Sequence, residues 1–332
     1  MNTLYKLNVL IPVFLVGLQI LLPSESIAQT NLRQSDIRPN TIDEIRNRQS
    51  LRQNRTLPPS NYGGIGKSDL GIQRPIDAKK TGFGYHLGFD TKLYFSNNPA
   101  SVNNGTLKEG SGVWENTLRN NFLLGAYDLG GLTFSPIINL SYTKFTHFGD
   151  DLFENFDFYT LGLNFAGIFQ FGQGWSIRPS LGLNFDLNPK EGLERQYHQI
   201  SPSLAVAKGF KMGTVQAFFE WSMAQHITDS AYVGPDSPSD KLNRFETALT
   251  TGLTIPFNDF EFSPFLRLGF NNYSNQDRKD FLTNLGLDLK YSFSNWFYLK
   301  LFANLSVRQS DDDIMDFNRF DSGLGAALNA KF

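Results

Sequence analysis

The sequence predicts an all-β fold, namely a closed antiparallel transmembrane β-barrel of about twelve strands that follows a short polar N-terminal arm. Long segments of alternating apolar and polar residues recur from about Gly82 to the end of the chain, and the connections between them alternate between short and long. No later segment approaches the ~20 consecutive apolar residues that a membrane-spanning helix needs. Because a strand points successive side chains to opposite faces, each segment has one face suited to lipid and one suited to water.

The first 28 residues are predicted to be a secretory signal peptide. Lys6 supplies the positive start, residues 9–22 form an apolar run, and Ser-Ile-Ala at 26–28 fits a cleavage site. An uncleaved membrane anchor is the alternative, which Pro12 and Pro23 disfavour because proline interrupts a helix. The chain contains no Cys, which excludes a disulfide framework and thiol chemistry.

Residues 29–80 are predicted to form a polar arm. Residues 30–80 hold ten Lys and Arg against five Asp and Glu, whereas residues 81–332 hold 19 against 26. Residues 41–44 fit the capping box of a helix that would end near Asn54. One short helix cannot bury a core, so we expect a mobile periplasmic arm. A plug inside the barrel and a basic contact to an anionic partner are the alternatives.

Residues 81–332 are predicted to form the barrel. The expected strands are 82–96, 113–128, 131–147, 155–171, 174–188, 196–210, 213–229, 243–257, 260–274, 279–293, 296–309 and 317–332. Short connections follow the even-numbered strands, at 129–130, 172–173, 211–212, 258–259 and 294–295. Longer or more acidic ones follow the odd-numbered strands, at 97–112, 148–154, 189–195, 230–242, 275–278 and 310–316. Short periplasmic turns and longer outer loops are typical of transmembrane barrels.

The predicted lipid-facing side is clearest in residues 175–187, where odd positions are apolar and even positions are polar or small. Aromatic residues gather at strand ends, as membrane-interface girdles do; they include Trp175, Phe257, Phe260, Phe293 and Phe297. The strand predicted at 113–128 is the least regular, because Asn116 and Asn120 interrupt its apolar face. We therefore expect a bulge there, or greater exposure above the bilayer.

The predicted inner face carries charges of both signs, which would be costly in contact with lipid. The candidates for lining a pore are Asp90, Lys92, Arg119, Arg178, Asp186, Glu220, Glu246, Arg267, Asp288, Lys290, Lys300 and Arg308; Glu115, Glu261 and Lys331 share this face. These charges either pair across the barrel and close it, or line a narrow water path and set its selectivity. Small residues on the same face favour some open volume; they are Gly88, Gly162, Gly182, Ser203, Ala205, Gly252, Gly286 and Gly325.

The chain ends in Ala-Lys-Phe332, preceded by Leu324, Leu328 and Ala330 at even spacing. With the signal peptide and the paired strands, this pattern resembles bacterial outer-membrane β-barrel proteins and is similar to β-barrel porins over residues 82–332. The resemblance implies that Phe332 is a recognition signal for the barrel-assembly machinery. It also implies a location in the outer membrane of a Gram-negative-type bacterium, with outer-membrane lipids and small solutes as further partners.

No motif indicates an enzyme, a cofactor or a nucleic-acid partner. None of the four His residues begins a His-x-Ser motif or follows an Asp by two positions; the nearest likeness to a catalytic pair is His226-Ile-Thr228. Asp311, Asp312 and Asp313 could bind a divalent cation, although a solvated acidic loop is the favoured interpretation. We therefore expect a porin-like channel for passive or weakly selective diffusion of small solutes. The alternatives are a non-conducting structural or surface-binding barrel, and a barrel enzyme of the lipase or protease type.

Overall fold

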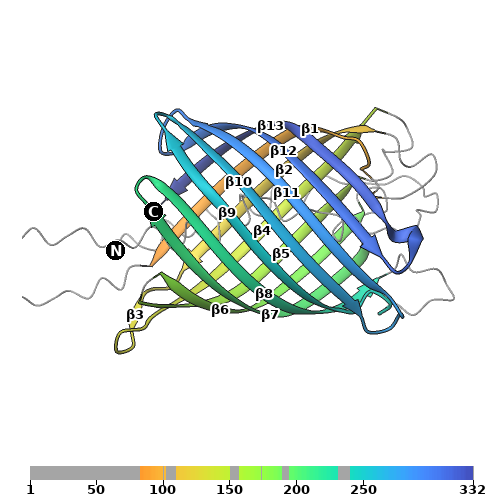
Figure 1. The fold of residues 1–332 in the computed structure, drawn as a ribbon, viewed down its shortest axis with the longest axis horizontal. Helices are drawn as coiled ribbons and strands as arrows, with labels where there is room; N and C mark the ends of the chain where they lie inside the picture. Colours follow the sequence, from red (N-terminus) through yellow and green to blue (C-terminus); the bar gives the residue numbers. More distant parts are fainter. Residues whose placement is uncertain are drawn as a thin grey trace, which may run out of the picture.

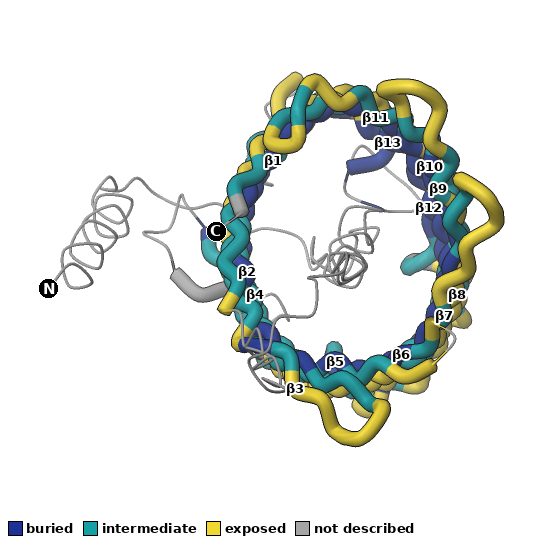
Figure 2. Tube along the Cα trace, turned by 90° about the vertical axis from the view of Figure 1, so that its left-hand side faces the viewer, coloured by how far each residue is buried: buried dark blue, intermediate teal, exposed yellow. Residues whose placement is uncertain are grey.

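A computed structural model describes residues 83–99, 101, 110–149, 157–172, 174–188, 194–230 and 240–331. These residues form a closed barrel of twelve antiparallel strands, with one further short strand attached at its rim (Figures 1 and 2). The all-β barrel prediction is confirmed. The predicted signal peptide and arm, the side chain of Lys331, and Phe332 lie outside the described residues.

The strands run in chain order around the barrel. They are β1 (Gly84–Ser96), β2 (Ser111–Leu123), β3 (Tyr127–Asp128), β4 (Thr133–Phe148), β5 (Phe158–Phe171), β6 (Trp175–Asn188), β7 (Glu194–Met212), β8 (Val215–Ser230), β9 (Arg244–Phe257), β10 (Phe260–Tyr273), β11 (Lys279–Ser292), β12 (Phe297–Ser310) and β13 (Phe317–Lys331). A short 3-10 helix, η4 (Asp313–Met315), precedes β13. No helix among the described residues is long and apolar enough to cross a membrane.

Pairing of the first and last strands closes the sheet. β1 pairs with β13 from His86 opposite Lys331 to Ser96 opposite Asp321. Every strand of the wall therefore has two neighbours, so no row of backbone N–H and C=O groups is left open at a sheet edge. Closure is what a lipid environment requires, because hydrocarbon offers these groups no hydrogen-bond partner.

The bulge expected in the strand predicted at 113–128 is present, but it lies at Gly125 rather than at Asn116 or Asn120, and the long strand ends earlier than predicted. β2 ends at Leu123, and the chain resumes pairing with β4 only at β3, after Leu124, Gly125 and Ala126. Gly125 has a φ of 135°, and three residues here face two on β4, which is a β-bulge. The hairpin of β3 and the start of β4 consequently leaves the wall and projects beyond the rim (Figure 1).

The connections are sorted by length between the two ends of the barrel. At the end where β1 begins and β13 ends, most turns are short, for example 172–174, 213–214 and 258–259. The bulged hairpin is the exception at this end, and the turn predicted at 211–212 lies two residues later. The connections at the opposite end are mostly longer, and the longest spans 97–110. This sorting agrees with short turns on the periplasmic side and longer outer loops.

The two faces of the wall differ in chemistry. Large apolar side chains are exposed on the outside, such as Leu181, Leu285 and Leu324, whereas the positions between them point into the lumen. Near one rim, Lys208 Nζ lies 4.9 Å from the centroid of the Trp175 ring, as expected for a cation held at a membrane interface. Asn120 of the irregular β2 also lies on the outer face, and its Oδ1 accepts a hydrogen bond of 2.6 Å from the Tyr85 hydroxyl.

Apolar packing inside the barrel is limited to small clusters. Phe218 packs on Phe265, and Phe145 stacks on Phe158 with ring centroids 4.6 Å apart. The remaining buried residues of the described lumen are mainly polar or charged. Hydrogen bonding around the sheet and the apolar outer belt therefore define this fold, rather than a continuous hydrophobic core.

Candidate functional site

All twelve predicted pore-lining residues lie on the lumen side of their strands. All but Arg119, Glu246 and Lys290 are buried. The alternation of each strand explains this placement, because every one of these residues sits between two outward-facing neighbours. The lumen wall is therefore the part of the described molecule in which charge is concentrated.

Most lumen charges pair along the wall rather than across the barrel. Lys92 Nζ lies 2.9 Å from Glu115 Oε1 on the next strand, and Arg119 pairs with Asp90 between the same two strands. Arg178 on β6 reaches over β7 to Glu220 on β8, with Nη2 and Oε2 2.9 Å apart. Three further pairs between strands are likewise local: Lys290 with Glu261, Arg267 with Glu246, and Arg308 with Asp280. Such pairs tie neighbouring strands together and leave space between opposite walls.

One row of the sheet collects lysines. Lys92, Lys300 and Lys290 lie in register across β1, β13, β12 and β11, with Gly325 in the β13 position. Glu115 and Glu261 occupy the two ends of this row. The glycine leaves room for the neighbouring Lys300 side chain, whose Cε and Cγ would crowd any added Cβ.

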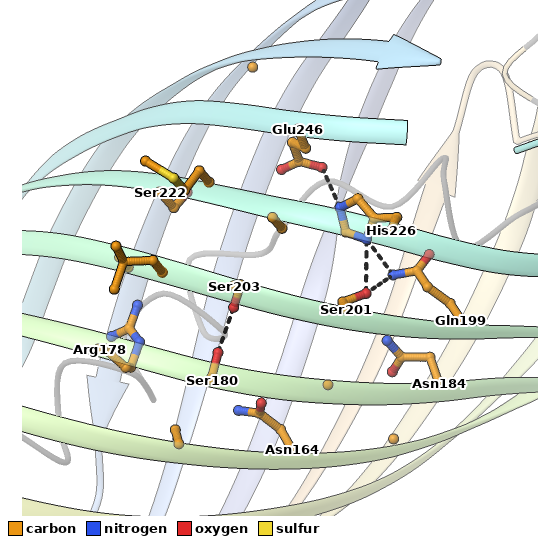
Figure 3. Close-up of a pocket in the computed structure, with 18 of the residues that line it drawn as sticks. Asn164, Arg178, Ser180, Asn184, Gln199, Ser201, Ser203, Ser222, His226 and Glu246 are labelled. Atoms are coloured by element: carbon orange, nitrogen blue, oxygen red, sulfur yellow. Dashed lines mark hydrogen bonds and ion pairs between the residues drawn. The ribbon is translucent and has the colours of Figure 1, made fainter. Parts of the chain in front are cut away.

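A cavity of about 400 Å³ opens in the lumen beside β4–β12. Ser, Asn and Arg are the commonest residue types in its described lining, and several of them are seen in Figure 3. Four of the predicted pore-lining residues border it, namely Arg178, Glu246, Arg267 and Arg308. Asp90, Lys92, Arg119, Asp186, Glu220, Asp288, Lys290 and Lys300 do not line this cavity. Four of the twelve predicted pore-lining residues therefore border this cavity, and the other eight lie elsewhere in the lumen.

A connected hydrogen-bond network lies on one wall of the cavity (Figure 3). His226 Nδ1 lies 2.9 Å from Ser201 Oγ and 2.7 Å from Gln199 Nε2. The Tyr197 hydroxyl donates to Gln199 Oε1 at 2.7 Å, which fixes the orientation of this amide. Since the Gln199 amide nitrogen can only donate, His226 Nδ1 is an acceptor, and the ring proton lies on Nε2.

The other side of this histidine faces an acid. His226 Nε2 lies 3.3 Å from Glu246 Oε2, while Arg267 holds Oε1 of the same carboxylate. Ser201, His226 and Glu246 come from the neighbouring strands β7, β8 and β9. The arrangement resembles the hydroxyl, imidazole and carboxylate of a nucleophilic site, with Nδ1 as the nitrogen that faces the hydroxyl.

A second charged group lies toward the end with the longer connections. Asp280 is fully buried and accepts hydrogen bonds from Arg278 and from the Tyr273 hydroxyl, the latter at 3.1 Å. The Arg278 guanidinium also stacks over the Tyr273 ring, 4.2 Å from its centroid. This group rigidly connects the start of β11 to the end of β10.

Several buried charged residues of the structure were not among the predicted lumen residues; they are Arg244, Arg278, Asp280, Arg319 and Asp321. Most of them could have been predicted from the alternation of their strands. Arg244 lies two residues from Glu246 on β9, and Asp280 lies eight residues from Asp288 on β11, so each points to the same face as the predicted residue. Ser201 and Gln199 carried no comparable signal, since polar uncharged residues are common on any water-facing strand. At the Asp311–Asp313 loop, Asp311 Oδ1 accepts the Lys279 backbone N–H at 2.8 Å. No group of metal-ligating side chains is found there or elsewhere among the described residues.

No protein-family model matches the sequence, and no curated protein matches it. Solved structures with a similar chain path include an outer membrane channel from Pseudomonas putida, at 14% identity and a TM-score of 0.49, covering 80% of this chain and 100% of that one. The NanC porin has 11% identity and a TM-score of 0.43 and covers 72% and 98%. The β-domain of the Bordetella autotransporter Brka has 13% identity and a TM-score of 0.41 and covers 74% and 98%.

These neighbours are channels, porins and autotransporter domains, so the likeness concerns fold alone. The closed sheet of twelve tilted strands, the apolar outer belt and the sorted connections are themselves the features of an outer-membrane barrel. The described residues therefore have the architecture of a transmembrane β-barrel of the outer-membrane type.

Proposed function

We propose that this protein is a porin-like channel for passive or weakly selective diffusion of small polar solutes. The observation that carries the proposal is the cavity of about 400 Å³ inside the closed barrel, lined by Ser, Asn, Gln and Arg side chains. A purely structural barrel is better stabilised by a lumen filled with side chains. A polar cavity instead suits solutes that exchange hydrogen bonds with water for hydrogen bonds with the wall.

The local pairing of the lumen charges supports the same proposal. Pairs such as Lys92 with Glu115 and Arg178 with Glu220 join strands that are adjacent or one apart. Pairs that crossed the lumen would obstruct it, whereas pairs along the wall strengthen the barrel without closing it.

The test is conductance of the purified, refolded full-length protein in planar bilayers. We expect discrete channel openings, together with swelling of proteoliposomes in small sugars. The control is the same protein without refolding, because an unfolded barrel should give neither signal. A folded, heat-modifiable barrel that neither conducts nor passes solutes would favour the non-conducting structural or surface-binding alternative.

One observation favours a second candidate function, a hydrolase within the barrel wall. Ser201 hydrogen-bonds His226, whose other ring nitrogen lies 3.3 Å from Glu246 Oε2, and this is the spatial order of groups that activates a serine hydroxyl; Ser201 and His226 border the cavity. In an ester hydrolase, Ser201 Oγ would attack the carbonyl carbon while His226 Nδ1 takes its proton and returns it to the departing alcohol. Water would then release the acid from the acylated serine by the reverse proton route.

Covalent labelling with a fluorophosphonate, followed by peptide mass spectrometry, tests this candidate. If the hydrolase proposal holds, Ser201 is labelled and Ser201→Ala loses both the label and p-nitrophenyl acetate hydrolysis. Ser203→Ala is the matched control, because Ser203 lies on the same face of β7 but hydrogen-bonds Ser180. Equal reactivity of the wild type and both variants would rule the hydrolase out and leave the channel proposal untouched.

A further inference from the structure

The described residues that line the cavity in the lumen carry more positive than negative side chains. Arg178, Arg244, Arg267 and Arg308 border it, and Glu246 is the sole carboxylate among these described lining residues. These arginines come from four different strands, with Arg178 on β6 and the others on β9, β10 and β12.

The carboxylates that balance two of these arginines lie outside the lining. Glu220 pairs with Arg178 and is 2% exposed, while Asp280 lies near Arg308 and is fully buried. Arg178 and Arg308 therefore border the cavity, whereas the acids that they pair with are not among its described lining residues. A solute in the cavity is closer to the positive member of each pair, so the local potential is positive although the described lumen is nearly neutral overall.

The space between the arginines is provided by small residues. Arg178 and Arg308 end one hydrogen-bonded row of the sheet, and most positions between them are small: Ala205, Ser222, Ala248, Gly269 and Leu282. Side chains of this size leave the floor of the cavity open between the two guanidinium groups. Arg267 lies beside this floor, two residues from Gly269 on β10.

The adjoining strands β4–β6 supply neutral hydrogen-bonding groups. Their polar uncharged contribution to the lining is six amides and hydroxyls, namely Asn139, Ser141, Thr160, Asn164, Ser180 and Asn184. Amides and hydroxyls both donate and accept, which suits the hydroxyl groups of a polar solute. Guanidinium groups bind carboxylate or phosphate oxygens through paired N–H donors.

We propose that this cavity is a binding site for small hydroxylated organic anions, of which sugar acids are the representative chemistry, and that it makes the channel prefer anions to cations. The inference rests on the proposed channel function and adds its substrate class. The arginines take the anionic group, and the amides and hydroxyls of β4–β6 take the hydroxyl groups.

Ion selectivity of the refolded full-length protein is the first test. In a KCl gradient, we expect a reversal potential that shows preference for chloride, and block of the current by glucuronate but not by glucose. Arg244→Gln should lower the chloride-to-potassium permeability ratio by about threefold and weaken the glucuronate block. Lys279→Gln is the matched control, since it removes one positive charge from an exposed residue at the start of β11.

The double variant Arg178→Gln with Glu220→Gln tests the placement of charge rather than its total. The net charge of the protein is unchanged. The Arg178 guanidinium, which borders the cavity, is nevertheless lost together with its partner Glu220, which is not among the described lining residues. We expect the chloride preference to fall here too. A conducting wild type without chloride preference or glucuronate block, or one whose selectivity is unchanged in both variants, overturns the anion site but leaves the channel intact. A folded wild type that never conducts overturns the channel and this inference together.

Discussion

The outer and inner faces of the barrel wall are built from the same strands, yet different interactions hold them together. On the outer face of β6, Leu183 lies in register with Leu163 and Ile200. One residue further, Asn184 lines the lumen cavity, where side chains meet polar partners and space. The outer face tolerates any apolar side chain of suitable size, whereas the inner face depends on particular charge pairs. The outer face therefore requires only that a side chain be apolar, whereas the lumen requires particular residues at particular positions.

The largest expected effect is the loss of one member of a buried inner pair. Arg178→Leu removes the positive charge beside Glu220, whose side chain is 3% exposed, and should destabilise the folded barrel by about 3–5 kcal/mol. Unfolding by guanidinium chloride in lipid vesicles measures this cost. Leu at both positions should recover much of it, because no buried charge then remains.

A stability cost below about 1 kcal/mol for Arg178→Leu would indicate that water screens the pair. The stability of the inner face would then depend on its ion pairs no more than that of an exposed surface does.

The next effect compares neighbouring residues of one strand. Leu183→Arg puts a charge on the lipid face near mid-strand and should cost about 2–4 kcal/mol, while Asn184→Arg in the lumen should cost much less. Refolding titrations of both variants in the same lipid give the difference directly. Equal costs would mean that the two faces of β6 have been assigned incorrectly.

The smallest effect concerns a polar contact on the outer face. Trp114 Nε1 donates to Thr91 Oγ1 at 2.8 Å, and the Trp114 side chain is 50% exposed. Trp114→Phe removes the donor and keeps the aromatic ring, so we expect a loss of about 0.6–1 kcal/mol in unfolding free energy. Thr91→Val should cost a similar amount, and the double variant no more than either single one. Additive losses would show that the two side chains contribute independently rather than through this hydrogen bond.

Prediction from the sequence succeeded best where structure is local. Twelve barrel strands were expected and twelve form the wall, with most boundaries within three residues. The bulge expected in 113–128 is present, but its position was not predicted, since it depends on how many residues between β2 and β3 oppose Ser135 and Pro136 on β4. The alternation of odd and even positions along each strand predicted which side chains point into the lumen. It could not show which of these side chains border the cavity.

The sequence by itself determined the class of fold, the two faces of each strand and the sorting of the connections. These properties follow from a period of two residues and from the positions of turns, both of which are read within a short window. Only the tertiary structure decided the pairing of Arg178 with Glu220, the contacts of His226 with Ser201 and Glu246, and the cavity with its arginines. These depend on the register between strands and on the curvature of the closed sheet. Closure places β1 beside β13 and brings together residues more than 200 positions apart in the sequence. For example, the hydroxyl of Tyr298 on β12 lies 3.5 Å from Oδ1 of Asp90 on β1.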